Sequence, residues 1–334
     1  MLLRLDPWAA EYNTAYHAQY NATVTDNAAK IDAAFESPLE AWQPVIPEPQ
    51  PLLWPLLLFL DGSRRIEARV LLESDDRSQL AFGALGSYAV GAVSCCPEQQ
   101  RRAAFVDAWD IGRLCTLGNG FALDTLKLPA QLPWQQGTVH YQVQAIADND
   151  ADAVVRALQQ RMLEAEKNLA QRLSQQHQAL IICDGPRPLL SQHSNVVGYL
   201  KTIHDLKITP KQLEVVRRLE QGQRSPLYLV SPSPEQQYVE WFLRLRDPRP
   251  WLYSLAGMVR LQAYAGLRPQ REQLCQLADW LSILLPRYAS RQHQDPRAPQ
   301  QLLPIHALEA ELKRRMGSAP LLRRRITQYL SEHN

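Results

Sequence analysis

Two apolar runs in this chain each end on an aspartate that is followed by a glycine. The segment Leu56–Glu73 reads LLLFLDGSRRIEARVLLE, so β-forming residues lie on both sides of Asp61-Gly62. Asp-Gly between two such runs is a strong signal for a two-residue β-hairpin. The pattern therefore predicts two antiparallel strands that turn at Asp61. The segment Ala179–Asp184 ends in the same way and predicts another strand.

The rest of the chain predicts alternating strands and helices. Residues 148–176 give the clearest helix, because Asp residues at its start suit the positive end of the helix dipole and Ala, Leu, Met and Gln fill its interior. Residues 8–35 also predict a helix, whereas five prolines in residues 44–55 predict a connector. Further helices are expected at residues 101–117, 210–220, 269–285 and beyond 299, and further strands at 79–96, 138–146, 195–201, 226–230, 241–245 and 255–263.

This order of elements is typical of an α/β fold in which helices cover the faces of a mixed sheet. A chain of 334 residues is long enough to bury a large core. We expect an N-terminal helical extension and its proline-rich connector at residues 1–50, a main domain at 51–310 and a basic helical tail at 311–334.

Composition and motifs exclude several function classes. The net charge is only +2, so any nucleic-acid footprint must be local. The N-terminus shows no apolar export signal, no apolar run is long enough to cross a bilayer, and the five cysteines form no C-x-x-C pattern. These features favour a cytoplasmic protein without a membrane span. The chain also lacks the P-loop, G-x-S-x-G and H-E-x-x-H motifs, so nucleotide hydrolysis by the P-loop route and the commonest serine hydrolase and metalloprotease mechanisms are not expected.

The C-terminal region is locally basic. Six basic residues and no acidic ones lie between Lys313 and Arg325. Such a run is most often a solvated helix face, and the other interpretations are contact with a phosphate backbone or with an acidic partner.

Three acidic residues form the candidate site. Asp61 and Asp184 each follow an apolar strand, so both are expected at strand ends. In the long helix between them, Glu166 falls on the stripe of Met162, Leu169 and Leu173, where an unpaired carboxylate would be costly. Its partner is expected to be a divalent cation or a basic side chain such as Arg64, Arg65 or Lys201. Glu164, two positions away, is expected to face solvent.

These motifs and their order resemble the NurA nucleases. The resemblance rests on the motif DGS at Asp61, a helical acid, DGP at Asp184, the stretch VVGYLK that ends at Lys201, and a proline seven residues before His306. It covers residues from about 55 to 310. The sequence departs from the family at Ala298, where family members often carry a tyrosine; the nearest tyrosine, Tyr288, lies ten residues earlier.

The resemblance implies an RNase H-like core in which Asp61, Glu166 and Asp184 bind Mn²⁺ or Mg²⁺. It implies that Lys201 contacts phosphate and that His306 lies near the reacting centre. The implied activity is that of a 5′-to-3′ exonuclease with single-strand endonuclease activity. The implied assembly is a homodimer that acts on DNA beside a HerA-type hexameric translocase, in DNA repair or defence.

Other interpretations remain open at this point. Without the resemblance, Lys201 is a lysine that ends a strand, and His306 is a surface or capping residue at the start of a helix. A catalytically silent RNase H-like subunit that docks a translocase or guides DNA also fits the sequence, and so does an enzyme that cleaves RNA.

Overall fold

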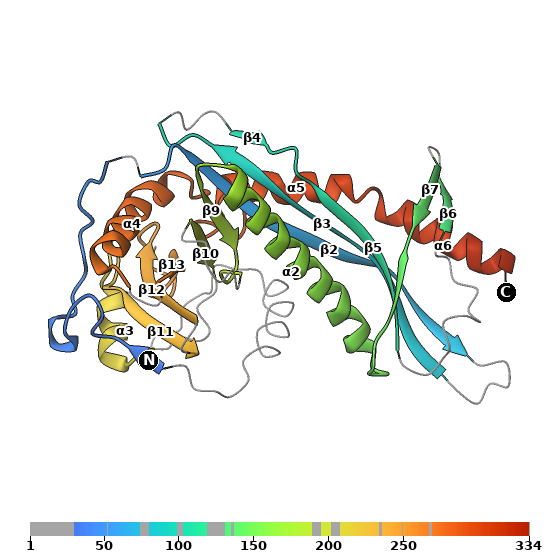
Figure 1. The fold of residues 1–334 in the computed structure, drawn as a ribbon, viewed down its shortest axis with the longest axis horizontal. Helices are drawn as coiled ribbons and strands as arrows, with labels where there is room; N and C mark the ends of the chain where they lie inside the picture. The colour runs from blue at the N-terminus through green and yellow to red at the C-terminus, as the bar shows by residue number, and fades with distance from the viewer. Residues whose placement is uncertain are drawn as a thin grey trace. The chain divides into compact units, whose positions relative to one another are not determined.

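The computed structural model describes residues 30–51, 53–73, 80–98, 103–118, 131–134, 137–188, 195–201, 208–233, 236–248, 250–266 and 269–333. They belong to two compact units. The first comprises residues 1–59, 93–104 and 170–306, and the second comprises residues 60–92, 105–169 and 307–334. Strands β2 and β3 and helices α2 and α5 contribute residues to both units, and Figure 1 labels these elements.

The first unit contains one region of a large mixed sheet. Its strands follow the spatial order β1-β11-β12-β13-β10-β9-β2. Strands β9 and β10 are parallel, whereas the pairs from β10 to β1 are antiparallel. The strands are β1 Lys30–Asp32, β11 Tyr228–Ser233, β12 Gln236–Arg244, β13 Met258–Tyr264, β10 Val196–Leu200, β9 Ala179–Asp184 and the start of β2 Leu56–Glu73.

Helices α3 Pro210–Arg217 and α4 Arg271–Leu284 accompany these strands, with short 3₁₀ turns at Leu39–Ala41 and Leu285–Arg287. Helix α3 begins with a capping box in which Thr209 and Gln212 bond each other's backbone N–H groups, and proline occupies its first position. The core beneath it is formed by buried side chains from α3, the sheet and the N-terminal segment, among them Trp42, Val216, Tyr228, Phe242 and Met258.

The strands of the second unit are the rest of β2, β3 Leu80–Cys95, β5 Asp110–Leu117 and β8 Gln142–Ala145, which neighbour one another in this order. Strand β4 Ala103–Phe105 pairs with β3, and β6 Gln131–Trp134 forms a separate hairpin with β7 Gly137–His140. The helices are α2 Ala151–Gln176, α5 Leu303–Arg315 and α6 Ala319–His333.

Helix α2 lies on one face of these strands, and α5 and α6 lie on the other (Figure 1). A Cβ atom at Gly86 of β3 would meet Leu158 of α2, whereas one at Gly91 would meet Leu308 of α5. The two glycines are an odd number of positions apart, so the alternation of the strand places them on opposite faces. The core on the α6 side is formed by residues such as Leu85, Cys115, Leu117, Leu322 and Ile326.

The prediction of a hairpin that turns at Asp61 is wrong. Strand β2 runs without a break through Asp61, Gly62 and Ser63 for 18 residues. A type I′ turn needs positive φ at its central residues, and the backbone at Gly62 does not lie in that region. Pairing along the length of the neighbouring β3 therefore overrides the local turn signal.

Two further expectations need correction. Residues 101–117 do not form a helix; their described part contains β4 and β5, because β5 pairs with β3 on one side and β8 on the other. The helix expected at residues 8–35 lies largely outside the described residues, and its last part, Lys30–Asp32, is strand β1 instead. The mixed sheet flanked by helices is confirmed, as are the helix at α2 and the strand that ends at Asp184.

Among the described residues, no helix combines the length and the apolar character that crossing a membrane requires.

Candidate metal centre

Asp61 projects from the buried part of β2. The four residues before it, Leu57 to Leu60, are almost completely inaccessible to solvent, and Asp61 itself is only 7% exposed. Its Oδ1 atom accepts a hydrogen bond of 2.8 Å from the backbone N–H of Gly62. This bond fixes the orientation of the carboxylate and stabilises its charged form.

Gly62 lies directly under the carboxylate of Glu166. A Cβ atom at position 62 would overlap the Oε1 atom of Glu166 and would stand 3.1 Å from the Cγ atom of Met162. The glycine of the Asp-Gly pair is therefore needed for the close approach of α2, and not for a turn.

The structure confirms that Glu166 lies on the buried stripe of α2. Met162, Leu169 and Leu173 are buried with it, and Glu166 is 9% exposed. Glu164 faces solvent and forms an ion pair of 2.8 Å with Arg161, as expected for the outer face of the helix. Burial thus favours Glu166 over Glu164 as the helical acid that takes part in a site.

Glu309 of α5 is a further acid of the site, and sequence reasoning missed it. A carboxylate oxygen of Glu309 lies within 4.8 Å of one of Asp61. The helical acid that accompanies Asp61 in the group of carboxylates suited to a metal ion is Glu309 rather than Glu166. Because side chains alternate along a strand, Asp61 points to the α5 face of β2, whereas position 62 faces α2.

A sequence signal for Glu309 was present. In α2, Glu166 follows Met162 by four residues and precedes buried leucines by three and seven. In α5, Glu309 holds the same place in the series Ile305, Leu312 and Met316, all three of which are fully buried. Both acids therefore lie on an apolar helical stripe, where a carboxylate requires a partner.

Asp184 and Lys201 form a buried ion pair in the first unit. They lie at the ends of the parallel strands β9 and β10, and the distance from Lys201 Nζ to Asp184 Oδ2 is 2.5 Å. The side chain of Lys201 is 6% exposed and that of Asp184 is 7% exposed. The Lys201 ammonium also donates to Oε1 of Gln301, so it bridges the strand ends to the segment before α5.

Gly185, unlike Gly62, does require glycine for its backbone conformation. Its φ is +107°, in the region that disfavours other residues. Its N–H and C=O groups both bond the backbone of Tyr199, at 2.8 and 2.9 Å. The turn after Asp184 therefore ends β9 while keeping it attached to β10, as expected for an acid at a strand end.

His306 lies in the first turn of α5 and pairs with a buried aspartate. Its Nδ1 atom is 2.7 Å from Oδ2 of Asp295, while the imidazole is 47% exposed. Arg297 also contacts Asp295, at 3.2 Å. Burial by itself would raise the pKa of Asp295, but hydrogen bonds from Arg297 and His306 together hold that pKa below its usual range. Asp295 therefore stays charged and orients the His306 ring, a role that sequence reasoning did not assign.

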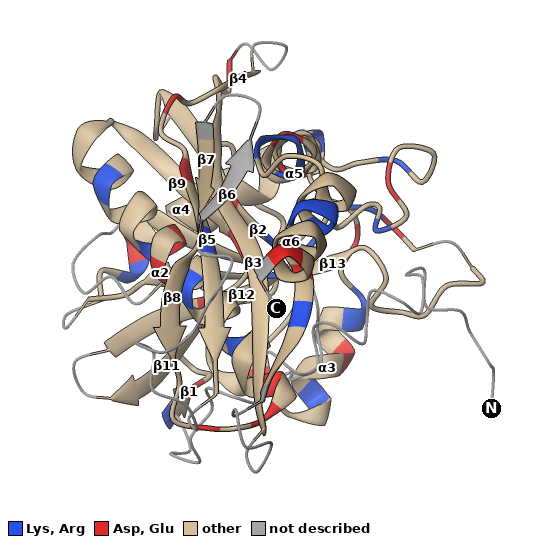
Figure 2. Ribbon diagram, turned by 90° about the vertical axis from the view of Figure 1, so that its right-hand side faces the viewer, with Lys and Arg blue, Asp and Glu red and all other residues tan. Residues whose placement is uncertain are grey.

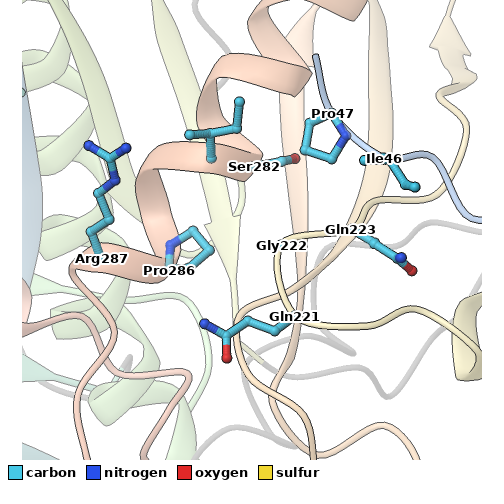
Figure 3. A pocket seen from close by; sticks show the side chains of 9 residues that line it. Ile46, Pro47, Gln221, Gly222, Gln223, Ser282, Pro286 and Arg287 are labelled. Atoms are coloured by element: carbon cyan, nitrogen blue, oxygen red, sulfur yellow. The ribbon is translucent and has the colours of Figure 1, made fainter. Parts of the chain in front are cut away.

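The first unit contains a pocket of about 510 Å³ that is lined mainly by apolar and uncharged polar residues (Figure 3). Its walls come from the proline-rich segment, the turn after α3 and the end of α4; they are Ile46, Pro47, Gln221, Gly222, Gln223, Ser282, Ile283, Pro286 and Arg287. None of the candidate acids lines it. Its only titratable group is Arg287, so it is not a candidate for acid–base or metal chemistry.

The positions of the acids follow from local rules. Asp61 follows a strand segment that is buried on both faces, a glycine at positive φ follows Asp184, and Glu166 and Glu309 lie on apolar helical stripes.

Searches against models of protein families and against curated proteins find no match to this chain.

Proposed function

We propose that this protein is a metal-dependent deoxyribonuclease in which Asp61 and Glu309 hold Mg²⁺ or Mn²⁺, with Asp184 as the further ligand that the resemblance to NurA nucleases implies. The observation that carries the proposal is the approach of the Asp61 and Glu309 carboxylates, one from a buried strand and one from a helix. Two carboxylates at this distance repel each other when both are charged. A cation bound between the two carboxylates would remove the free-energy cost of this repulsion.

The donor set fits a hard divalent cation. All three groups are carboxylates, and oxygen ligands are what Mg²⁺ and Mn²⁺ prefer. No described cysteine or histidine belongs to the group, so it lacks the donors that favour zinc. When bound at such a site, these cations activate the attacking water and stabilise the leaving oxygen of a phosphodiester.

The surrounding residues orient these groups. The N–H of Gly62 fixes the carboxylate of Asp61, and the ammonium of Lys201 fixes that of Asp184. Glu166 approaches β2 from the α2 side at Gly62, and the resemblance to NurA nucleases keeps it as a further candidate ligand. Asp295 holds the imidazole of His306 by its Nδ1 atom, which suits a proton carrier.

The finer parts of the proposal rest on the resemblance to NurA nucleases. They are the RNase H-like core, the 5′-to-3′ and single-strand activities, the homodimer, the HerA-type translocase as partner, and a cytoplasmic role in DNA repair or defence. Of these parts, the mixed sheet flanked by helices supports the core alone.

A cleavage assay tests the proposal. Linear DNA labelled at its 5′ end is incubated with Mn²⁺ or Mg²⁺ and with wild-type protein, Asp61→Asn or Glu309→Gln. We expect each variant to lose about a hundredfold or more in rate, since even the supporting partners of metal ligands contribute about 10- to 100-fold. Glu164→Gln, which removes an exposed acid of α2, is the matched control and should keep full activity. Full activity in both site variants would refute the assignment.

The ion pair between Asp184 and Lys201 favours a second candidate function. Lys201 already balances the charge of Asp184, as in a protein that has no need of a cation there. The chain would then be a silent subunit that docks a translocase or guides DNA. Calorimetric titration separates the two functions, because the silent subunit should show no Mn²⁺ binding that depends on Asp61.

A further inference from the structure

The two C-terminal helices carry a row of exposed basic side chains. We define the basic surface as Lys313 and Arg314 of α5 and Arg323, Arg324 and Arg325 of α6, all of which are exposed. Figure 2 shows Lys and Arg on both helices, and Figure 1 shows α6 continuing in much the same direction as α5. The only acidic residue of α6 is Glu332, in its last turn.

The charges of α6 are not neutralised within the described part of the chain. Arg325 bonds the neutral Oε1 of Gln328 at 3.1 Å, and Arg323 and Arg324 form no salt bridge there. On α5, Arg314 pairs with Glu311, whereas Lys313 has no acidic partner among the described residues. Four positive charges therefore point to solvent, and holding them together on a folded surface costs free energy unless an anion balances them.

The basic surface lies on a firmly anchored support. Leu322 and Ile326 of α6 are almost completely buried in the core of the second unit. At the end of α5, the carbonyl of Met316 accepts hydrogen bonds from Arg65 at 3.0 Å and from Arg113 at 3.1 Å. Gly317, with φ of +81°, then allows the chain to leave α5. The arginines thus extend from fixed helices, so ordering them costs only side-chain entropy.

We propose that the basic surface binds the phosphate backbone of DNA, without preference for base sequence. This inference rests on the proposed nuclease function and deepens it, because it assigns the path of the substrate. Lys313 follows Glu309 by four residues and so lies one turn further along the same face of α5. If one phosphate of a DNA strand lies near Glu309, the next phosphates of that strand would lie along the basic side chains of α5 and α6.

The chemistry of the surface favours phosphate over the alternatives. Arginine binds phosphate oxygens through two parallel N–H groups, and four of the five residues are arginines. The exposed face of α6 presents no aromatic side chain for stacking on bases. Its one large exposed apolar residue is Leu321, which is too little for the apolar centre of a protein interface.

Salt dependence gives a quantitative test. Each phosphate contact to duplex DNA contributes about 0.9 to the slope of log affinity against log salt, and each contact to a single strand about 0.7. Loss of three arginine contacts should lower the slope by about 2.7 on duplex DNA and by about 2.1 on a single strand. At 0.1 M salt the affinity for duplex should fall on the order of a hundredfold.

The experiment measures fluorescence anisotropy of labelled duplex and single-stranded DNA with the full chain, in EDTA so that no DNA is cleaved. The test variant carries Arg323→Gln, Arg324→Gln and Arg325→Gln. The matched control carries Lys167→Gln, Arg172→Gln and Lys211→Gln, three exposed residues on other helices that remove the same charge. Circular dichroism checks that both variants are folded, as expected for changes of exposed side chains.

A drop in affinity and slope for the test variant alone supports the proposal. Equal binding by wild type, test variant and control overturns it, and so does a wild type that binds polyglutamate as tightly as DNA of the same charge. The fate of the nuclease proposal is measured separately. If the test variant binds DNA normally while wild type cleaves it with Mn²⁺, only the path of the substrate is refuted.

Discussion

The carboxylate of Glu166 occupies the space in which any residue other than glycine at position 62 would place its Cβ atom. Helix α2 can approach β2 this closely only because Gly62 has no side chain. Gly62, which the sequence suggested as part of a turn, is therefore in contact with an acid of α2 that lies 104 positions later in the chain.

The first prediction concerns Gly62→Ala. The added methyl group must displace Glu166, so we expect the free energy of unfolding to fall by about 1–3 kcal/mol, as for overpacking of a core. In a Glu166→Ala background the space is available, and the same change should cost at least about 1 kcal/mol less. Urea denaturation of the four proteins measures this coupling. If Gly62→Ala lowered the free energy of unfolding equally in both backgrounds, Glu166 would not be the reason that position 62 requires glycine.

The second prediction concerns binding of the metal. Mn²⁺ at about 100 times its dissociation constant should stabilise the folded protein by about 2.7 kcal/mol, which raises Tm by a few degrees. Glu309→Gln should abolish the rise in Tm, because it removes a ligand and also the charge repulsion that the cation would relieve. Glu164→Gln should keep it. Thermal unfolding with Mn²⁺ and with EDTA provides the measurement, and an unchanged rise in Glu309→Gln would exclude Glu309 as a ligand.

The third prediction concerns the ion pair of Asp184 and Lys201. Lys201→Met leaves the buried carboxylate of Asp184 without its ammonium partner, so we expect the free energy of unfolding of the metal-free protein to fall by about 3–5 kcal/mol. The double variant Lys201→Met/Asp184→Asn removes both charges, so its free energy of unfolding should fall clearly less. Denaturation in EDTA compares the two variants. A double variant that loses as much free energy of unfolding as Lys201→Met, or more, would mean that the two side chains are not coupled.

The fourth prediction concerns the pH dependence of Asp295. The pKa of Asp295 is lowered in the folded protein from its ordinary value of 3.8, so its charged form contributes stability above about pH 4. That contribution is lost as the pH falls through the lowered pKa. Asp295→Asn should therefore be less stable than wild type by about 1.5–3 kcal/mol at pH 7. The difference should stay constant down to about pH 5 and narrow below pH 4, as measured by chemical denaturation across this range. A difference that does not depend on pH would contradict the role of the charge.

Much of the architecture could be predicted from periodicity. The stripe of Met162, Glu166, Leu169 and Leu173 gave helix α2 and the inward direction of Glu166, because a pattern with a period near 3.6 over 26 residues has no competing explanation. Residues 101–117 were mistaken for a helix, since short apolar runs carry no distinct period and pairing with β3 and β8 decides their structure.

In the candidate site, too, some positions could be predicted from local sequence and others depend on tertiary packing. Asp184 could be placed at a strand end because Gly185 takes up a turn locally. At Asp61 the same dipeptide lies inside an 18-residue strand, and only tertiary pairing distinguishes the two cases. Glu309 was missed although α5 repeats the spacing seen in α2, because proximity to Asp61 depends on how a helix near the C-terminus docks on a strand near the N-terminus.

The hydrogen bonds from Arg65 and Arg113 to Met316 have a consequence for Glu309. Asp61 and Arg65 lie on the same face of β2, about 13 Å apart along the strand, and Glu309 and Met316 are about 10 Å apart along α5. The helix is thus bonded to the strand at Met316, through Arg65, while Asp61 and Glu309 lie beside each other further along. Sliding α5 by a single residue would break the bond between Arg65 and Met316. The last turn of α5 therefore sets the register that holds Glu309 beside Asp61, although no carboxylate of the site lies in that turn.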